Sequence, residues 1–131
     1  MFNFVLRKGA SMNKCHFVGK ICKPVSYKLI ERKEGKTVPV INFTLEVCRK
    51  FEKKTGESKE HKSYLDFEAW DSGAEKIYAG FQEGDWITVH TSAKVDTYID
   101  SEGNKVSKVR FRVNEFEYPQ WQDEKTQNEL K

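Results

Sequence analysis

Two large aromatic side chains and two carboxylates alternate within the stretch SYLDFEAWDSGAE, residues 63–75. Alternate residues of a β-strand point to opposite faces, so the aromatic and acidic residues share one face and the apolar residues between them share the other. The first face carries Tyr64, Asp66, Glu68 and Trp70. The burial of large rings normally contributes too much to stability for two of them to stand on a solvent face without a partner. The pattern therefore predicts a face on which flat ligand groups stack.

The same carboxylates suggest a catalytic alternative, a magnesium-dependent nuclease that uses Asp66, Glu68 and Asp71. Strand alternation turns Asp71 away from the other two, and the local sequence places no histidine or lysine to activate water. The chain also has no phosphate-cradling glycine loop, no nucleophile elbow and no cysteine–histidine signature. We therefore predict that the protein is not an enzyme and has no cofactor.

Cys15, His16 and Cys22 suggest a zinc site, but the first two point to opposite sides of a strand and no second close pair follows. We predict that the protein holds no metal. With Cys48, the chain has three cysteines and no CxxC spacing. This odd number fits reduced thiols in a cytoplasm better than a disulfide framework.

Hydrophobic periodicity predicts one strand after another, with a single helical interruption. The main strands are expected over residues 13–22, 38–50, 63–70, 86–95 and 105–118, and a short return strand over 26–32. The helix should follow Asp71 and Ser72, two competent N-caps. Its buried face should comprise Ala74, Ile77, Tyr78 and Phe81. Five main strands with one helix between the third and the fourth predict an all-β OB-fold, a small Greek-key barrel.

Alternation also predicts the inner faces of the last two main strands. Val95 should face inward on the fourth, and Val109 should face inward on the fifth, opposite to Arg110 and Arg112. Gly19 should mark a bend or bulge in the first strand.

The chain of 131 residues is long enough for one domain, and no stretch approaches the ~18 apolar residues of a membrane span. The opening MFNFVLRKGAS is too short and too polar for a secretory signal, so residues 1–11 are expected to be a leader or an upstream-start extension. Residues 12–118 form the expected domain and 119–131 a short polar tail. Residues 12–131 carry 21 basic and 20 acidic side chains, so a phosphate partner must use local basic stripes.

Rings beside basic stripes are typical of proteins that bind single-stranded nucleic acid, which offers a phosphate and an unpaired base at every nucleotide. Tyr64 and Trp70 are separated by about 20 Å along a strand. This separation suits two nucleotides better than one small ligand.

Five fragments of the chain resemble a known family. After Met12-Asn13-Lys14 come FVGKI, NFTLEVCRKFEKKTGE, SYLDFEAWDSGAEKI, GDWITVHTSAKVDTYIDSEGNK and RFRVNEFEY. In this order and spacing they resemble the bacterial and phage single-stranded DNA-binding protein family over residues 12–118. The resemblance implies a protein that coats single-stranded DNA during replication, recombination or repair, in the cytoplasm and nucleoid of a bacterium or phage-infected host.

The resemblance also implies where DNA binds. Bases are expected to stack on Phe51, Tyr64, Trp70 and Tyr98. The candidate contacts to the DNA backbone are Lys50, Lys53, Lys54, Lys94, Lys105, Lys108, Arg110 and Arg112. Members of the family usually assemble as homotetramers through the first strand and the barrel face. Residues 15–21 are therefore the expected contact region, with a dimer as the alternative.

Two features depart from the family pattern. Asp66 and Glu68 place negative charge between the stacking rings, where they either orient basic side chains or bond to base edges. We expect DNA affinity to depend on salt and to be lower than a wholly basic groove would give. The chain also ends in TQNELK, without the acidic, hydrophobic tip that recruits replication proteins. This puts such recruitment in doubt and favours a phage or mobile-element protein, a specialised paralogue or a truncated chain.

Two alternatives stay open at the level of sequence. The domain could be an OB module that binds RNA or a replication protein, because no residue identifies a reader of the 2′-hydroxyl. Tyr64 and Trp70 could also form a protein interface, and Trp86 is expected at the barrel rim or in subunit packing.

Overall fold

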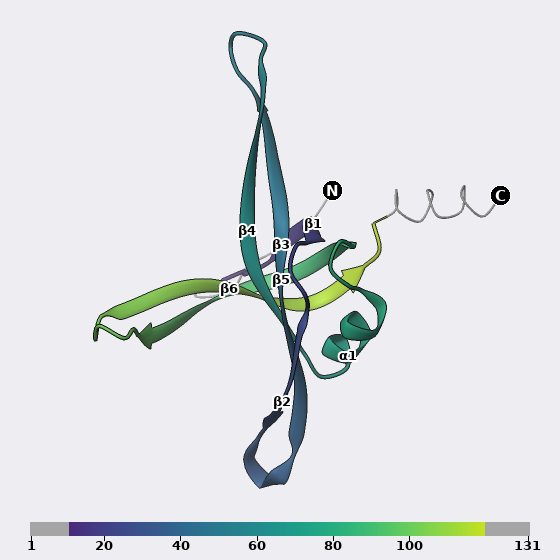
Figure 1. Ribbon diagram of the computed structural model, residues 1–131, viewed down its shortest axis with the longest axis vertical. Helices are drawn as coiled ribbons and strands as arrows, with labels where there is room; N and C mark the ends of the chain where they lie inside the picture. The colour runs from purple at the N-terminus through teal and green to yellow at the C-terminus, as the bar shows by residue number, and fades with distance from the viewer. Residues whose placement is uncertain (1–10, 120–131) are drawn as a thin grey trace, which may run out of the picture.

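The computed structural model describes residues 11–119. Its elements, in chain order, are β1 (Cys15–Ile21), β2 (Ser26–Glu31), the 3₁₀ turn η1 (Lys33–Gly35), β3 (Thr37–Glu52), β4 (Ser58–Trp70), α1 (Asp71–Gly80), β5 (Trp86–Ile99) and β6 (Lys105–Glu117). The five predicted main strands correspond to β1, β3, β4, β5 and β6, and the predicted return strand to β2 (Figure 1). The helix lies between the third and fourth main strands, as predicted.

The strands close into a barrel through β1. The sheet order is β1-β5-β6-β4-β3-β2, and an additional pairing of β1 with β3 joins its two ends. Pairing with β5 covers residues 15–20 of β1, and pairing with β3 begins at Lys20. All ladders are antiparallel except β4 with β6, which pair in parallel at Phe67 and Phe111. This closed barrel confirms the predicted OB-fold.

Gly19 lies where β1 passes from β5 to β3. A Cβ at this position would lie 2.9 Å from the carbonyl oxygen of Glu46 and 3.0 Å from a methyl group of Val47. The sequence predicts a bend here, and the structure gives the glycine a further role. It allows two backbones to approach each other closely enough to close the barrel.

The core is built around the ring of Phe67, which is fully buried. Its centroid lies 5.4 Å from that of Phe17, 5.5 Å from that of Phe43 and 5.3 Å from that of Phe111. These rings come from four different strands, so the inward alternation predicted for the strands brings them to one point. Burial of this aromatic surface stabilises the closed barrel.

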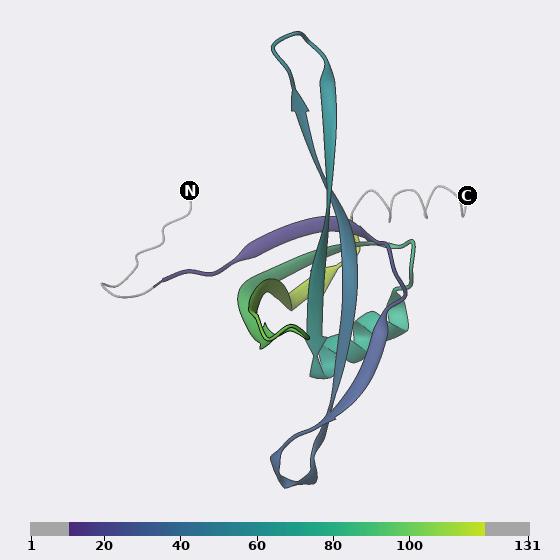
Figure 2. The same ribbon diagram turned by 60° about the vertical axis from the view of Figure 1, so that its left-hand side comes forward.

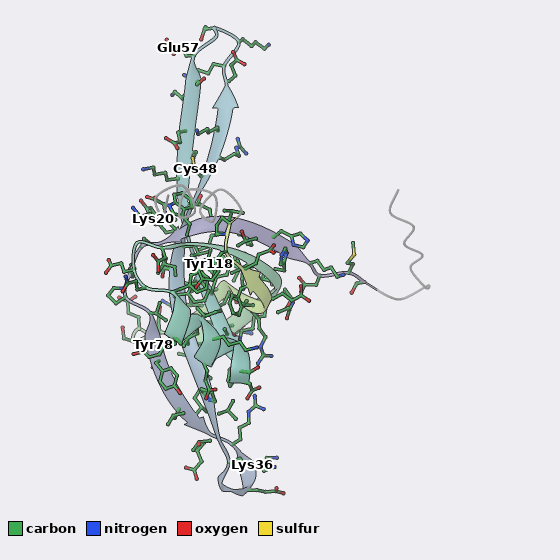
Figure 3. The ribbon with its side chains drawn as sticks, turned by 90° about the vertical axis from the view of Figure 1, so that its right-hand side faces the viewer. Lys20, Lys36, Cys48, Glu57, Tyr78 and Tyr118 are labelled. Atoms are coloured by element: carbon green, nitrogen blue, oxygen red, sulfur yellow. The ribbon has the colours of Figure 1, made fainter. Side chains whose placement is uncertain are left out.

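The helix closes one end of the barrel with Ala74 and Ile77, both fully buried. Phe81, just after the helix, is also buried, as predicted. Tyr78, labelled in Figure 3, is the exception, because it is 51% exposed. Its ring centroid lies 4.8 Å from that of Tyr27 on β2. The prediction that Tyr78 is buried is therefore wrong. The β2 strand, rather than the core, faces it.

The predicted helix caps are also wrong. Within residues 11–119, no side chain caps the start of α1, and Trp70 holds the N-cap position. Asp71 has φ of 57°, a left-handed conformation that Asp tolerates better than most residues. Its role is to turn the chain sharply from β4 into the helix.

Three hairpins extend beyond the barrel. The β3–β4 and β2–β3 hairpins project in opposite directions, and β5–β6 projects sideways (Figures 1 and 2).

Val95 and Val109 pair with each other on the β5–β6 hairpin and are exposed, so their predicted inward positions are wrong. The reason is that β4 pairs with β6 only at residues 111–112 and covers none of the hairpin beyond that point.

Among the described residues 11–119, no helix has both the length and the apolar character needed to cross a membrane.

Candidate nucleic-acid interface

The outward side chains of β4 lie at the centre of a continuous surface formed by neighbouring strands. Glu68 is in register with Asn42 of β3 on one side and with Arg112 of β6 on the other. Lys94 and Asp96 of β5 extend the surface beyond β6. We call this surface the outer face. Its residues are Asn42, Thr44, Glu46, Tyr64, Asp66, Glu68, Trp70, Lys94, Asp96, Tyr98, Lys108, Arg110 and Arg112.

Tyr64 is an open aromatic platform. Its side chain is 60% exposed, and its hydroxyl donates a hydrogen bond of 3.3 Å to Glu46 Oε1. Lys62 Nζ lies 3.7 Å from the same carboxylate oxygen. The ring is therefore oriented by its hydroxyl and has room for a flat group to stack on it.

Tyr98 is the second open platform and lies on the β5–β6 hairpin. It is 51% exposed and pairs with Val106. Alternation places it on the same side of the hairpin as Asp96 and Lys108, which pair with each other. The hairpin therefore carries a ring at its end and charged groups nearer the barrel.

Trp70 differs from both tyrosines because charged groups cover it. The guanidinium carbon of Arg112 lies 4.9 Å from the ring centroid, and that of Arg32 lies 5.1 Å away. The indole Nε1 is buried and has no acceptor within residues 11–119. The sequence pattern correctly places Trp70 on this face, but it does not reveal Arg32. The sequence signal that could have found Arg32 is its position at the end of the predicted return strand.

A network of ion pairs lies between the rings. Lys94 Nζ is 2.7 Å from Glu68 Oε1 and 3.5 Å from Asp96 Oδ1. Lys108 pairs with Asp66, Arg110 Nε lies 3.6 Å from Asp96 Oδ2, and Arg112 Nε lies 4.0 Å from Glu68 Oε1. The two acidic residues that depart from the family pattern, Asp66 and Glu68, therefore form ion pairs with basic side chains of the outer face.

Asp66 shows the electrostatic effect of this network. Its carboxylate accepts hydrogen bonds from Lys108 and, at 3.0 Å, from the hydroxyl of Thr44. The Lys108 ammonium lowers the pKa of Asp66 below its ordinary value, although partial burial opposes the shift. Asp66 is therefore ionised at neutral pH.

A shallow hollow adjoins the network between β2 and β6. Its polar lining comprises Lys23, Ser26, Lys28, Asn42, Thr44, Asp66 and Arg110. Arg110 Nη1 donates a 3.4 Å hydrogen bond to Asn42 Oδ1 across the outer face. Sequence reasoning did not identify Asn42, Thr44, Lys23 or Lys28, whose proximity depends on the pairing of strands distant in sequence.

Comparison with known proteins identifies the family. A model described as the Single-strand binding protein family matches residues 12–119. The chain belongs to this family. The resemblance carried by the five sequence fragments is confirmed. Proteins of the family bind DNA without catalysis, so the protein is not an enzyme, as predicted.

The solved structures agree on the fold of this family member. The chain is similar to a small single-stranded DNA-binding protein from Streptomyces coelicolor, with a TM-score of 0.64 and 15% identity. The similarity covers 83% of this chain and 95% of that chain. A search among curated proteins found no similar sequence.

The β3–β4 hairpin of this single-strand binding family member carries three of the predicted basic residues. Lys50 lies on the outer side of β3, and Lys53 and Lys54 lie at the turn. Lys59 lies close enough to Lys53 to lower the pKa of the Lys53 ammonium from its ordinary value. Phe51 pairs with Lys59 through its backbone, but its side chain lies outside the described part of the structure.

The strand register separates Lys105 from Lys108, Arg110 and Arg112, the other predicted backbone contacts on β6. Lys105 pairs with Ile99, next to the pair of Tyr98 with Val106. Alternation therefore directs Lys105 to the side of the hairpin opposite Tyr98.

The first strand is fully incorporated into the barrel of the family member and carries an unusual contact. His16 Nδ1 lies 2.6 Å from His90 Nδ1. On the other side of the ring, His90 Nε2 lies 3.3 Å from Glu117 Oε1. Among residues 11–119, no three histidine, cysteine or acidic side chains form a group that could hold a metal ion. The three cysteines are free thiols. Trp86 pairs with Lys20 at the end of the ladder between β1 and β5, on the barrel rim.

Proposed function

We propose that the protein binds single-stranded DNA without strong sequence preference and protects it during replication, recombination or repair. The observation that carries the proposal is the outer face itself, where two exposed tyrosine rings flank a layer of basic side chains. Membership of the single-strand binding family and the similarity to a solved single-stranded DNA-binding protein support it. We further propose that residues 12–118 form the binding domain and that it acts in the cytoplasm.

Bases stack on Tyr64, Trp70, Tyr98 and Phe51. Stacking tolerates any sequence because every base has a flat face, and each stacked base contributes roughly 1–3 kcal/mol, a magnitude known from single-stranded DNA-binding proteins themselves. Tyr64 and Trp70 are separated by about 20 Å, so they engage different nucleotides of one strand.

Phosphates contact the basic side chains around these rings. The contacts are Lys50, Lys53, Lys54, Lys94, Lys108, Arg110 and Arg112, with Lys105 beyond them on the hairpin. Because Lys94, Lys108 and Arg110 already have acidic partners, a phosphate must compete with Glu68, Asp66 and Asp96. This competition lowers affinity compared with a wholly basic groove.

The protein assembles as a homotetramer, or alternatively as a dimer, through residues 15–21 and the adjoining barrel face. Val18 and Trp86 are exposed large side chains at β1 and at its partner strand β5, which supports a contact there. Sedimentation at several protein concentrations measures the assembly state, and a strict monomer would contradict this part of the proposal.

Titration of the protein with dT oligomers of increasing length, followed by fluorescence anisotropy at two salt concentrations, tests the proposal. We expect Tyr98→Ala to weaken binding about tenfold for every base composition, because one stacking platform is lost. Tyr78→Ala is the matched control, because Tyr78 has the same exposed fraction of 51% but lies beside β2 and α1, away from the outer face. Equal affinities for the two variants would contradict the assigned face. A parallel titration with poly(U) distinguishes a protein dedicated to RNA, which would bind poly(U) more tightly than the dT oligomers.

A further inference from the structure

Trp70 lies between two arginines that approach it from different strands. Arg112 is on β6 and Arg32 follows β2, and these strands lie on opposite sides of β4 in the sheet order. The guanidiniums therefore reach the ring from strands on different sides of β4. A base that stacks on Trp70 has to compete with them for the ring.

The two arginines are held differently. Arg112 Nε lies 4.0 Å from Glu68, a carboxylate whose side chain is only 5% exposed, and Arg112 is in register with Glu68 beside the barrel. Arg32 is exposed at the start of the β2–β3 turn, and no carboxylate within residues 11–119 forms an ion pair with it. Arg32 is therefore the guanidinium that can leave.

The covered arrangement also leaves one polar group unsatisfied. Trp70 Nε1 is buried and has no hydrogen-bond acceptor among the described residues. A buried donor without a partner is unfavourable, so a ligand that offers an acceptor to this N–H gains a hydrogen bond that the free protein lacks. A cation–π contact at an exposed site is also weaker than the stacking of a base.

We propose that Arg32 is a displaceable cover of Trp70. On binding, a base takes the place of the Arg32 guanidinium on the ring, and the released guanidinium pairs with a phosphate of the same strand. Arg32 is thus a positioning residue that controls access to one stacking platform. The inference rests on the proposed function, because it assumes that Trp70 stacks on DNA.

Quenching by acrylamide tests the cover in the free protein. Trp86→Phe and Trp121→Phe leave Trp70 as the single tryptophan of the chain. In this background we expect Arg32→Ala to raise the quenching constant of Trp70 by about twofold, because one of two covering groups is removed. Lys76→Ala is the matched control, since it removes a positive charge from an exposed residue of α1 that lies outside the outer face and its hollow. It should leave quenching unchanged.

The salt dependence of binding to labelled dT oligomers tests the exchange. Arg32→Ala should reduce the slope of log affinity against log salt by about 0.7, the value for one lost phosphate contact on a single strand. The plot of log affinity against log salt for Arg32→Ala should cross that of the wild type. At low salt the variant should bind more weakly, because it lacks a phosphate contact. At high salt it should bind more tightly, because that contact is screened in the wild type while the Trp70 ring of the variant stays uncovered. Arg32→Lys should keep the wild-type slope. Lys76→Ala should bind with equal or lower affinity than the wild type at every salt concentration, without a crossing.

The proposal is overturned if Arg32→Ala leaves the quenching of Trp70 unchanged, or if its plot of log affinity against log salt never crosses that of the wild type. Trp70→Ala separates this failure from failure of the proposed function. If Trp70→Ala weakens binding about tenfold while Arg32→Ala fails either criterion, Trp70 is a platform without a cover. If Trp70→Ala leaves affinity unchanged, Trp70 does not stack on DNA, and the proposed role of Arg32 is wrong as well.

Discussion

The ammonium of Lys94 lies 2.7 Å from Oε1 of Glu68, a carboxylate with only 5% of its side chain exposed. The contact is an ion pair without hydrogen-bond alignment, because this oxygen has no hydrogen-bond partner among residues 11–119. The charges of Lys94 and Arg112 therefore compensate the buried carboxylate of Glu68 within the outer face. Four of the basic residues assigned to DNA, Lys94, Lys108, Arg110 and Arg112, are at the same time structural partners of buried or partly exposed acids.

Asp66→Asn should therefore strengthen DNA binding. The substitution removes the acidic partner of Lys108 and leaves its ammonium free for a phosphate. We expect tighter binding at low salt and a slope of log affinity against log salt that is steeper by about 0.7. Anisotropy titrations at four salt concentrations measure both quantities. Glu75→Gln, an exposed site on α1, controls for the change in net charge and should leave the slope nearly unchanged.

Asp66 should also make stability depend on acid pH. Its folded-state pKa is lowered mainly by Lys108, so its stabilising effect is fully present above its unfolded pKa of about 3.9 and is lost as the pH falls through the lowered folded value. Urea denaturation from pH 7 to pH 2 measures the free energy of unfolding. The wild type should lose more of this energy below about pH 4 than Asp66→Asn does. Parallel curves for the two proteins would show that the carboxylate contributes nothing.

Cys48 reports on the β3–β4 hairpin. Its thiol donates a 2.8 Å hydrogen bond to Glu60 Oε1, and this contact raises the pKa of Cys48 above its ordinary value. Glu60→Gln should lower that pKa and speed alkylation at pH 8, because the thiolate is the reactive form. Cys15→Ser with Cys22→Ser leaves Cys48 as the single thiol for the measurement. Bound dT oligomer should slow the reaction if the strand runs along this hairpin, and an unchanged rate would place the strand elsewhere.

The closure of the barrel at Gly19 can be tested with a matched pair of glycines. Gly19→Ala places a methyl group 2.9 Å from a backbone oxygen that cannot move aside, so we expect a loss of ~1–3 kcal/mol in the free energy of unfolding. Gly73 lies within α1, and a Cβ there would meet no atom outside its own helix within 4 Å, so Gly73→Ala should instead stabilise by ~0.5–1 kcal/mol. Thermal and urea denaturation measure both. Equal effects would show that β1 has room to shift.

Strand alternation and the order of elements predict much of this protein. They identify the outer face of β4 and the aromatic core beneath it, because a strand has only two faces and one of them must be buried. They do not predict what lies across a face. The contact of Arg32 with Trp70 and the hollow beside Asn42 depend on the pairing of distant strands.

The errors in prediction share a second physical cause. Alternation continues along a strand even where the barrel ends, so Val95 and Val109 follow the inward pattern on a hairpin that nothing in residues 11–119 covers. Tyr78 has helical spacing for the core, but the edge of α1 where it lies meets Tyr27 instead. Periodicity specifies a side of an element, whereas tertiary contacts decide how far the buried side extends.

In the proposed complex, the acidic neighbours of Lys94 and Lys108 also bear on how a DNA strand leaves. When a phosphate departs, Glu68 or Asp66 is already within reach of the vacated ammonium. We therefore expect each of these phosphates to be exchanged for a carboxylate of the protein, one contact at a time. A strand held in this way can be released from one end without breaking all of its phosphate contacts at once.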